Sequence, residues 1–309
     1  VYTRDLLAGL PVLKKIAEIE TRILFNLDSS NFQPQNWISL AQTVHAERPN
    51  YDGFVIVHGT DTMAYTASAL AFLIPGLDRS VVFTGSQAPL SNVRTDGRTN
   101  LVDACHLATM RIPEVSIAFH SKLLRGCRAT KIDAWGLSAF ASPSCPPLAE
   151  LGLGVQLAPH ILGPRPPEPF DPRIETEVLA LRAFPGLNPR LLHGALSLGV
   201  RGVLLEAFGV GNVPMQHNSL IPFIEEATAR DVPVVIVSQS ARGAVDLSRY
   251  EGGALAKKAG AIGAGDMSSE AALAKLMIAL GRAVPEGNPS QTRIAAVKNA
   301  FEIARVGEM

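Results

Sequence analysis

Short runs of β-branched and apolar residues alternate with longer helical patterns along most of this chain. One such run, Phe54–Val57, lies between turn residues, and a helical stripe of apolar residues follows it over 62–73. The runs Val81–Phe83 and Val115–Phe119 continue this order, with a helical pattern over 100–110 between them. A short apolar run bounded by turn residues is typical of a buried parallel strand. Repeated strand–turn–helix units therefore predict an α/β fold made of doubly wound, mostly parallel sheets.

A proline-rich stretch between residues 142 and 177 interrupts this order. Prolines break helices and central strands, so the stretch predicts a boundary between two domains. We expect a larger N-terminal domain over 1–170, a linker over 171–177 and a smaller C-terminal domain over 178–309. In the second domain we expect strands at 178–184, 202–208 and 233–238, helices at 219–229 and 268–280, and a peripheral helix in the tail 285–309.

The composition excludes several classes of protein. The 309 residues contain 28 Lys and Arg against 28 Asp and Glu, and this balance predicts no nucleic-acid partner and no anionic-membrane partner. Apolar residues make up 47% of the chain, which excludes wholesale disorder, and no apolar run is long enough to span a bilayer. Three cysteines without metal-ligand spacing, and no signal-peptide pattern after Val1, predict a cytoplasmic protein without disulfides or a bound metal.

The segment His58–Thr62 joins the end of an expected strand to the start of an expected helix. Backbone N–H groups at such a helix start attract anionic groups, and ligands of open α/β sheets bind outside the carboxyl ends of the strands. A simpler interpretation is that Thr60 or Asp61 only caps the helix. We interpret His58 as a turn residue, because His, Asp and Cys do not cluster around it at the spacing of a metal site.

His58–Met63, preceded by Tyr51–Val57, resembles the second signature of the bacterial-type L-asparaginases. Further segments resemble motifs of the same family in the same chain order: Asp28–Ser30, Thr84–Gln87, Asp96–Leu101, Arg128–Lys131, Phe208–Asn212 and Gly263–Met267. The match runs from about residue 24 to about residue 280, and it is closer to the cytoplasmic type I branch than to the secreted branch. Several motifs in one order are far more specific than any one of them alone.

The resemblance implies an amidohydrolase that converts L-asparagine to L-aspartate and ammonia without a metal or organic cofactor. Thr60, Asp61 and Lys131 would form a hydrogen-bonded relay, because a threonine hydroxyl needs a base before it becomes a useful nucleophile or activates water. Asp61 would also pair with the ammonium group of the substrate. The substrate-binding set implied by the family is Asp28, Ser29, Ser30, Thr60, Asp61, Ser86 and Asn212. The resemblance also implies a homotetramer built as a dimer of dimers, in which Asn212 reaches the site of a neighbouring subunit.

The first nucleophile of the family stands in a Thr-Gly-Gly-Thr-Ile turn, and this chain contains no such string. Val1-Tyr2-Thr3 matches the residues before Gly-Gly in that turn, so we assign the nucleophile to Thr3. The short distance along the chain from Thr3 to Ser29 favours an omitted loop over divergence. We expect Thr3 to form an acyl-enzyme, which water activated near Thr60 and Lys131 then hydrolyses.

Three alternatives remain open at the level of sequence. A glutaminase, or a glutaminase-like subunit of a tRNA amidotransferase, would use the same relay, and one methylene of substrate is worth only about 1 to 3 kcal/mol. A catalytically impaired asparagine sensor would bind through Ser29 and Asp61 and release no ammonia. A structural α/β domain without a ligand would respond to changes at Asp61 or Lys131 in stability alone.

Overall fold

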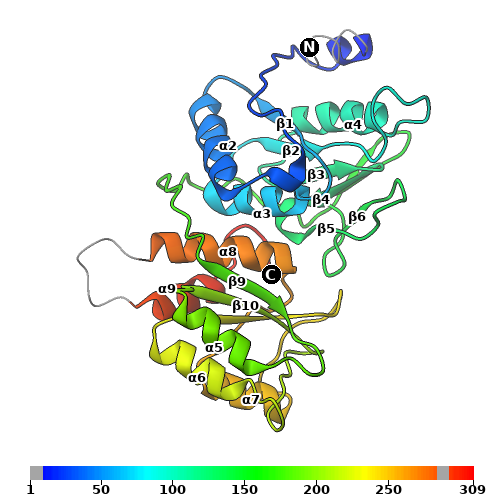
Figure 1. Ribbon diagram of the computed structural model, residues 1–309. Helices are drawn as coiled ribbons and strands as arrows, with labels where there is room; N and C mark the ends of the chain where they lie inside the picture. The colour runs from blue at the N-terminus through cyan, green and yellow to red at the C-terminus, as the bar shows by residue number, and fades with distance from the viewer. Residues whose placement is uncertain (1–9, 284–291) are drawn as a thin grey trace. The chain divides into compact units, whose positions relative to one another are not determined.

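A computed structural model of the protein describes residues 10–283 and 292–309. The chain divides into two compact units, one ending at Phe170 and the other beginning at Asp171. Each unit contains a sheet with helices packed against it (Figure 1). The predicted α/β class is therefore confirmed.

The N-terminal unit contains a six-stranded sheet in the order β1-β2-β3-β4-β7-β8. The first three strands pair in parallel, and the others pair antiparallel. The antiparallel strands are short and follow one another closely along the chain. The strands are β1 (Gly53–Val57), β2 (Ser80–Thr84), β3 (Val115–Phe119), β4 (Lys122–Arg125), β7 (Ala149–Leu151) and β8 (Val155–Leu157). A separate two-stranded hairpin consists of β5 (Thr130–Lys131) and β6 (Phe140–Ala141).

Helices cover both faces of this sheet (Figure 1). One face carries α4 (Gly97–Thr109), which packs on β1, β2 and β3, and the other carries α3 (Met63–Leu73) with α2 (Pro34–Glu47) behind it. Almost every residue of α3 is buried, as expected for a helix that is apolar on all sides. The described part of this unit also contains three short 3-10 helices: η1 (Pro11–Lys15), η2 (Ser29–Asn31) and η3 (Gly126–Arg128).

The C-terminal unit contains a four-stranded parallel sheet in the order β12-β11-β10-β9. Its strands are β9 (Val178–Arg182), β10 (Gly202–Ala207), β11 (Val234–Ser238) and β12 (Ile262–Gly263). On one side lie α8 (Ser269–Arg282) and α9 (Arg293–Glu302), and on the other lie α5 (Pro189–Ser197), α6 (Ile221–Ala229) and α7 (Glu251–Lys258) (Figure 1). Both faces of the sheet are thus covered, as in a doubly wound fold.

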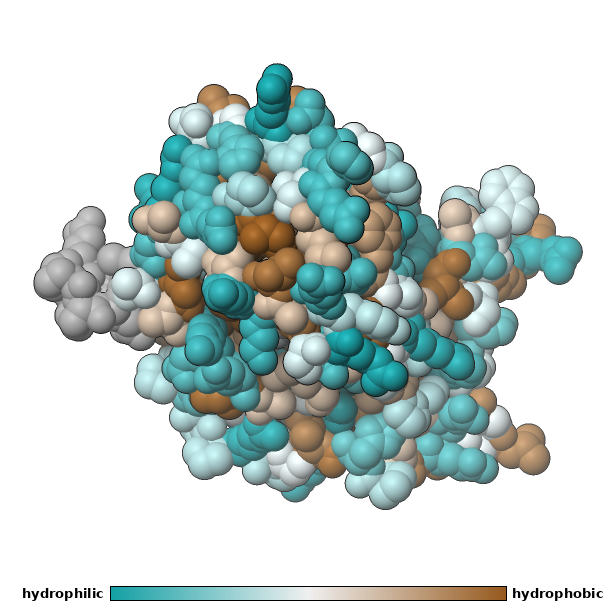
Figure 2. Space-filling view, turned by 90° about the horizontal axis from the view of Figure 1, so that it is seen from below, coloured by the Kyte–Doolittle hydropathy of each residue, from teal (hydrophilic) through white to brown (hydrophobic). Residues whose placement is uncertain are grey.

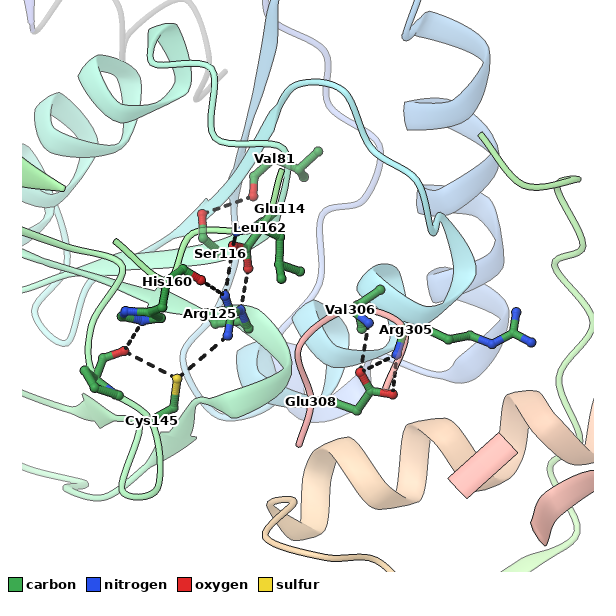
Figure 3. A network of polar contacts seen from close by, with 11 residues as sticks. Val81, Glu114, Ser116, Arg125, Cys145, His160, Leu162, Arg305, Val306 and Glu308 are labelled. Carbon is green, nitrogen blue, oxygen red and sulfur yellow. Dashed lines mark hydrogen bonds and ion pairs between the residues drawn. The ribbon is translucent and has the colours of Figure 1, made fainter. Parts of the chain in front are cut away.

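Each unit also buries charged side chains that are fully engaged in polar contacts (Figure 3). In the N-terminal unit, Arg125 on β4 forms an ion pair with Glu114, and one Glu114 oxygen lies 3.0 Å from the guanidinium. Glu114 also accepts a hydrogen bond of 2.7 Å from the backbone nitrogen of Leu162. In the C-terminal unit, Glu308 pairs with Lys275 of α8. These pairs attach long irregular segments to the helices and strands.

Hydrophobic side chains reach the surface in small groups separated by hydrophilic ones on the face seen in Figure 2. Small dispersed groups of this kind are ordinary for a folded domain. Across residues 10–283 and 292–309, no helix combines the length and the apolar character needed to cross a membrane.

The structure differs from the sequence-based expectations at both strands and helices, and the short strands β4 to β8 and β12 were not expected. The helix expected at 100–110 begins earlier, at Gly97. The tail helix expected within 285–309 is α9, and residues 284–291 lie outside the described residues. Three helices, α2, α5 and α7, were not expected. The last two contain glycine, which lowers helix propensity by about 1 kcal/mol per residue.

Candidate active site

The turns that follow β1 and β2 lie side by side at one edge of the N-terminal sheet. Val57 pairs with Thr84 at the ends of these two parallel strands, and His58 donates its backbone N–H to the Thr84 carbonyl at 2.8 Å. The residues that follow, Thr60 after β1 and Gln87 after β2, therefore leave the sheet at the same edge. This edge, outside the carboxyl ends of parallel strands, is where open α/β sheets bind ligands.

Lys131 of β5 contacts both predicted members of the relay. Its Nζ lies 2.9 Å from Thr60 Oγ1 and 2.6 Å from Asp61 Oδ1. The Lys131 side chain is 20% exposed and that of Asp61 is 63% exposed, so the group is open to a ligand at its carboxylate end. The structure thus brings together Thr60, Asp61 and Lys131. A neutral lysine amine at this distance can accept the hydroxyl proton of the threonine.

Gln87, for which the sequence predicts no role, forms a second contact to the same threonine. Thr60 Oγ1 lies 3.0 Å from Gln87 Oε1. The other end of the amide donates to the carbonyls of Asp133 and Gly136, at 3.4 and 3.2 Å. These two residues belong to the β5–β6 connection (residues 132–139), which begins directly after Lys131. The signals in the sequence were the position of Gln87 after a buried strand and its place in the segment Thr84–Gln87, which resembles a family motif.

Ser29 packs directly against the turn that carries Thr60. Thr62 donates its hydroxyl to the Ser29 carbonyl at 2.8 Å. A Cβ atom at Gly59 would come within 2.6 Å of Ser29 Oγ, so only glycine allows this approach. The Ser29 side chain, in a residue that is 6% exposed, is therefore held beside the relay, where a substrate carboxylate could reach it.

The other residues predicted for the substrate loop have different contacts. Asp28 Oδ1 accepts hydrogen bonds from the backbone nitrogen and the hydroxyl of Ser30, at 2.8 and 2.6 Å. The hydrogen bonds from the Ser30 hydroxyl and backbone hold the pKa of Asp28 below its usual value. This pair caps η2 and shapes the loop around Ser29. Ser86 is half-buried and directly follows the β2 turn.

His58 belongs to a chain of hydrogen bonds behind the turn. Its Nδ1 lies 2.7 Å from the Gly59 carbonyl, and its Nε2 lies 3.1 Å from Thr66 Oγ1. Trp37 Nε1 donates to the same hydroxyl at 3.2 Å. With Nδ1 protonated, every donor in this chain faces an acceptor. Burial lowers the pKa of His58, which favours this neutral form.

Two of the predicted residues belong to other parts of the chain. Thr3 lies outside the described residues. Asn212 belongs to the C-terminal unit, where its backbone pairs with Phe208 at 2.8 and 3.0 Å. Asn212 Oδ1 is buried there without a hydrogen-bond partner. In the part of the chain that the structure describes, no group of three or more His, Cys, Asp or Glu side chains could hold a metal ion.

Comparison with known proteins identifies the family of this chain. A family model described as "Asparaginase, N-terminal" matches residues 1–161, and one described as "Glutaminase/Asparaginase C-terminal domain" matches residues 177–292. The chain belongs to the asparaginase family.

Individual members of the asparaginase family match most of the chain. The L-asparaginase of Thermococcus kodakarensis is 42% identical over 266 residues, which cover 86% of this chain and 80% of the relative. A solved structure of the thermostable L-asparaginase from that organism superposes with a TM-score of 0.89 at 38% identity, covering 99% of this chain and 91% of the other. L-asparaginase 1 of Escherichia coli is 40% identical over 256 residues, or 81% of this chain and 75% of the relative. The predicted resemblance to the type I branch of an amidohydrolase family is confirmed.

The family also includes relatives of another activity. A glutamyl-tRNA(Gln) amidotransferase subunit of Methanothermobacter thermautotrophicus is 34% identical over 289 residues, covering 90% of this chain and 66% of the relative. Membership of the family therefore does not determine which amide is the substrate.

Proposed function

We propose that this protein hydrolyses L-asparagine to L-aspartate and ammonia. The contacts of Lys131 with Thr60 and Asp61 are the observation that supports this activity best. Amide hydrolysis needs a base that can activate a hydroxyl or a water molecule, and a neutral lysine beside a threonine supplies one. The identity to L-asparaginases over most of the chain supports the same substrate.

The polar groups around the relay suit the charged ends of an amino-acid substrate. The exposed Asp61 carboxylate would pair with the substrate ammonium, and the hydroxyl of Ser29 would donate to the substrate carboxylate. The amide carbon would then lie near Thr60. In the reaction that we propose, the Thr3 hydroxyl attacks this carbon to form an ester, and the C–N bond breaks as the amide nitrogen takes the hydroxyl proton and leaves as ammonia. Water activated through Thr60 and Lys131 then cleaves the ester, which releases aspartate and restores the Thr3 hydroxyl.

Ammonia release from L-asparagine and from L-glutamine by the purified protein tests this function. We expect turnover of L-asparagine with saturation, and a lower kcat/KM for L-glutamine. Saturable binding of L-asparagine without ammonia release would contradict the enzyme function and favour an asparagine sensor. The homotetramer with Asn212 at a subunit interface and the cytoplasmic location stay predictions, which sedimentation and cell fractionation would test.

Glutamine hydrolysis is the second candidate, because the amidotransferase relative is similar to 90% of the chain. The two substrates differ by one methylene, which is worth about 1 to 3 kcal/mol in a fitted pocket. A kcat/KM that is higher for L-glutamine than for L-asparagine would favour this candidate.

A further inference from the structure

Gln87 connects the two halves of the relay through one side-chain amide. Its oxygen lies 3.0 Å from Thr60 Oγ1, in the turn after β1. Its nitrogen donates to Gly136 and Asp133 in the β5–β6 connection, the segment that follows Lys131. The backbone of Gln87 is also held, because its N–H lies 3.1 Å from both carboxylate oxygens of Asp96. The amide is therefore fixed at both ends.

These contacts determine the direction of the Thr60 hydroxyl. The amide nitrogen of Gln87 faces two backbone carbonyls, which are acceptors only, so its oxygen must face Thr60. A lysine ammonium only donates, so Thr60 offers a lone pair to Lys131 and directs its single proton to Gln87. When the Lys131 amine is neutral, the hydroxyl proton must turn from Gln87 to Nζ before it can be transferred.

We propose that Gln87 is a positioning residue of the relay: it holds the Thr60 proton away from the charged form of Lys131 and fixes the spacing of Thr60 and Lys131. This role rests on the proposed function of the relay. In this role Gln87 does not itself take the proton that passes from Thr60 to Lys131. It acts on the substrate only through Thr60 and through the β5–β6 connection.

Three carboxylates surround this arrangement, and each has its own contact. Asp61 pairs with the Lys131 ammonium at 2.6 Å. Asp133, in the same connection as Gly136, accepts hydrogen bonds from the backbone of Trp135 and Gly136. Asp96 holds the Gln87 backbone. Replacing Gln87 by the similarly sized, uncharged methionine leaves these carboxylates in place, so any change in the behaviour of Lys131 comes from the lost amide.

Chemical labelling of Lys131 tests the proposal without relying on catalysis. The full-length protein is treated with trace acetic anhydride across a pH series, and acetylation of Lys131 relative to the exposed Lys258 is read by peptide mass spectrometry. Without Gln87, the Thr60 proton can turn to Nζ and stabilise the neutral amine. We expect Gln87→Met to lower the midpoint of Lys131 labelling by about half a pH unit or more. In a Thr60→Val background, the same change at position 87 should leave the midpoint unaltered.

Equal shifts in the two backgrounds, or no shift at all, would overturn the proposal. Gln239→Met is the matched control, because Gln239 also donates its amide nitrogen to two backbone carbonyls but lies in the C-terminal unit. It should leave the labelling of Lys131 unchanged. Kinetics give a second test: because the amide no longer fixes the spacing of Thr60 and Lys131, Gln87→Met should lower kcat by about 100-fold with little change in KM for L-asparagine, even though its Lys131 amine is neutral more often. If the wild type releases no ammonia, the proposed function fails, and the labelling comparison still decides the role of Gln87.

Discussion

Lys131 Nζ lies 2.9 Å from Thr60 Oγ1, although 71 positions separate the two residues in the chain. The turn after β1 supplies the threonine, and a two-stranded hairpin outside the main sheet supplies the lysine. The relay therefore forms only after both segments have packed on the N-terminal unit. Any change that moves the hairpin acts on the chemistry without touching the turn.

Replacing Lys131 by methionine should remove the base of the relay while keeping most of its volume. We expect kcat for L-asparagine to fall by about 10²- to 10⁴-fold, with the melting temperature little changed. Lys258→Met, at an exposed position of α7, is the control and should retain wild-type kcat. Wild-type turnover by Lys131→Met would show that the relay assignment is wrong.

Replacing Ser29 by alanine should mainly weaken substrate binding. Ser29 lies beside the turn and would hold the substrate carboxylate in the ground state and the transition state alike. A hydrogen bond to a charged group is worth about 1.5 to 3 kcal/mol, so we expect KM to rise by about tenfold or more at similar kcat. Ser248→Ala in the C-terminal unit serves as the control. A collapse of kcat at unchanged KM would contradict the binding role.

The partly buried His58 predicts that stability is lost on acidification. Burial lowers the pKa of His58 from its unfolded value of 6.5, so between the two values the unfolded chain binds more protons. The contribution of His58 to stability is therefore complete above pH 6.5 and is lost as the pH falls through its folded pKa. Urea unfolding at pH 8 and pH 5 should show this loss, at most about 1.4 kcal/mol per pH unit. The loss should be smaller in His58→Asn, and an equal loss in both proteins would exclude His58 as its source.

Breaking the buried pair of Arg125 and Glu114 should destabilise the N-terminal unit strongly. Arg125→Met leaves the Glu114 carboxylate buried without its partner, which costs about 3 to 5 kcal/mol. Arg173→Met breaks an exposed pair with Asp171 and should cost less than about 1 kcal/mol. Urea unfolding of the two variants compares them directly. Similar losses of unfolding free energy in both variants would mean that the buried pair stabilises the protein no more than the exposed pair does.

Gly252→Ala should disturb the surroundings of Asn212. A Cβ at position 252 would lie 2.4 Å from both Asn212 Oδ1 and the Val213 carbonyl, so we expect a loss of about 1 to 3 kcal/mol. Gly194 of α5 has open space around it, and Gly194→Ala should stabilise the protein by up to about 1 kcal/mol. Thermal unfolding gives the sign of each effect. Stabilisation by both changes would contradict the close contact at Asn212.

The strands β1, β2 and β3 could be predicted from sequence, because they are short apolar runs bounded by turn residues, whereas the two-residue strand β5 that carries Lys131 could not. The helix α7 could not, since Gly252 and Gly253 near its start weaken its local helix propensity. Packing on α6 compensates for that weakness in the folded unit. Tertiary contacts of this kind leave no periodic pattern in the sequence.

The candidate site, too, could be predicted from sequence only in part. The relay could be assembled from sequence only through the family motifs, because nothing local connects Thr60 with Lys131. The role of Gln87 could not be predicted, because an uncharged amide after a strand has no chemical signature by itself. Its importance depends on the orientation of its two ends, and orientation exists only in three dimensions.

The two tryptophans of the chain lie in very different surroundings. Trp37 is buried and donates to Thr66 behind the turn, whereas Trp135 is 94% exposed, between the two residues whose carbonyls Gln87 holds. Their emission spectra should therefore separate, with Trp37 blue-shifted and shielded from iodide and Trp135 red-shifted and readily quenched. The protein thus contains two intrinsic optical probes, one for each side of the relay, and no added dye is needed to follow the hairpin.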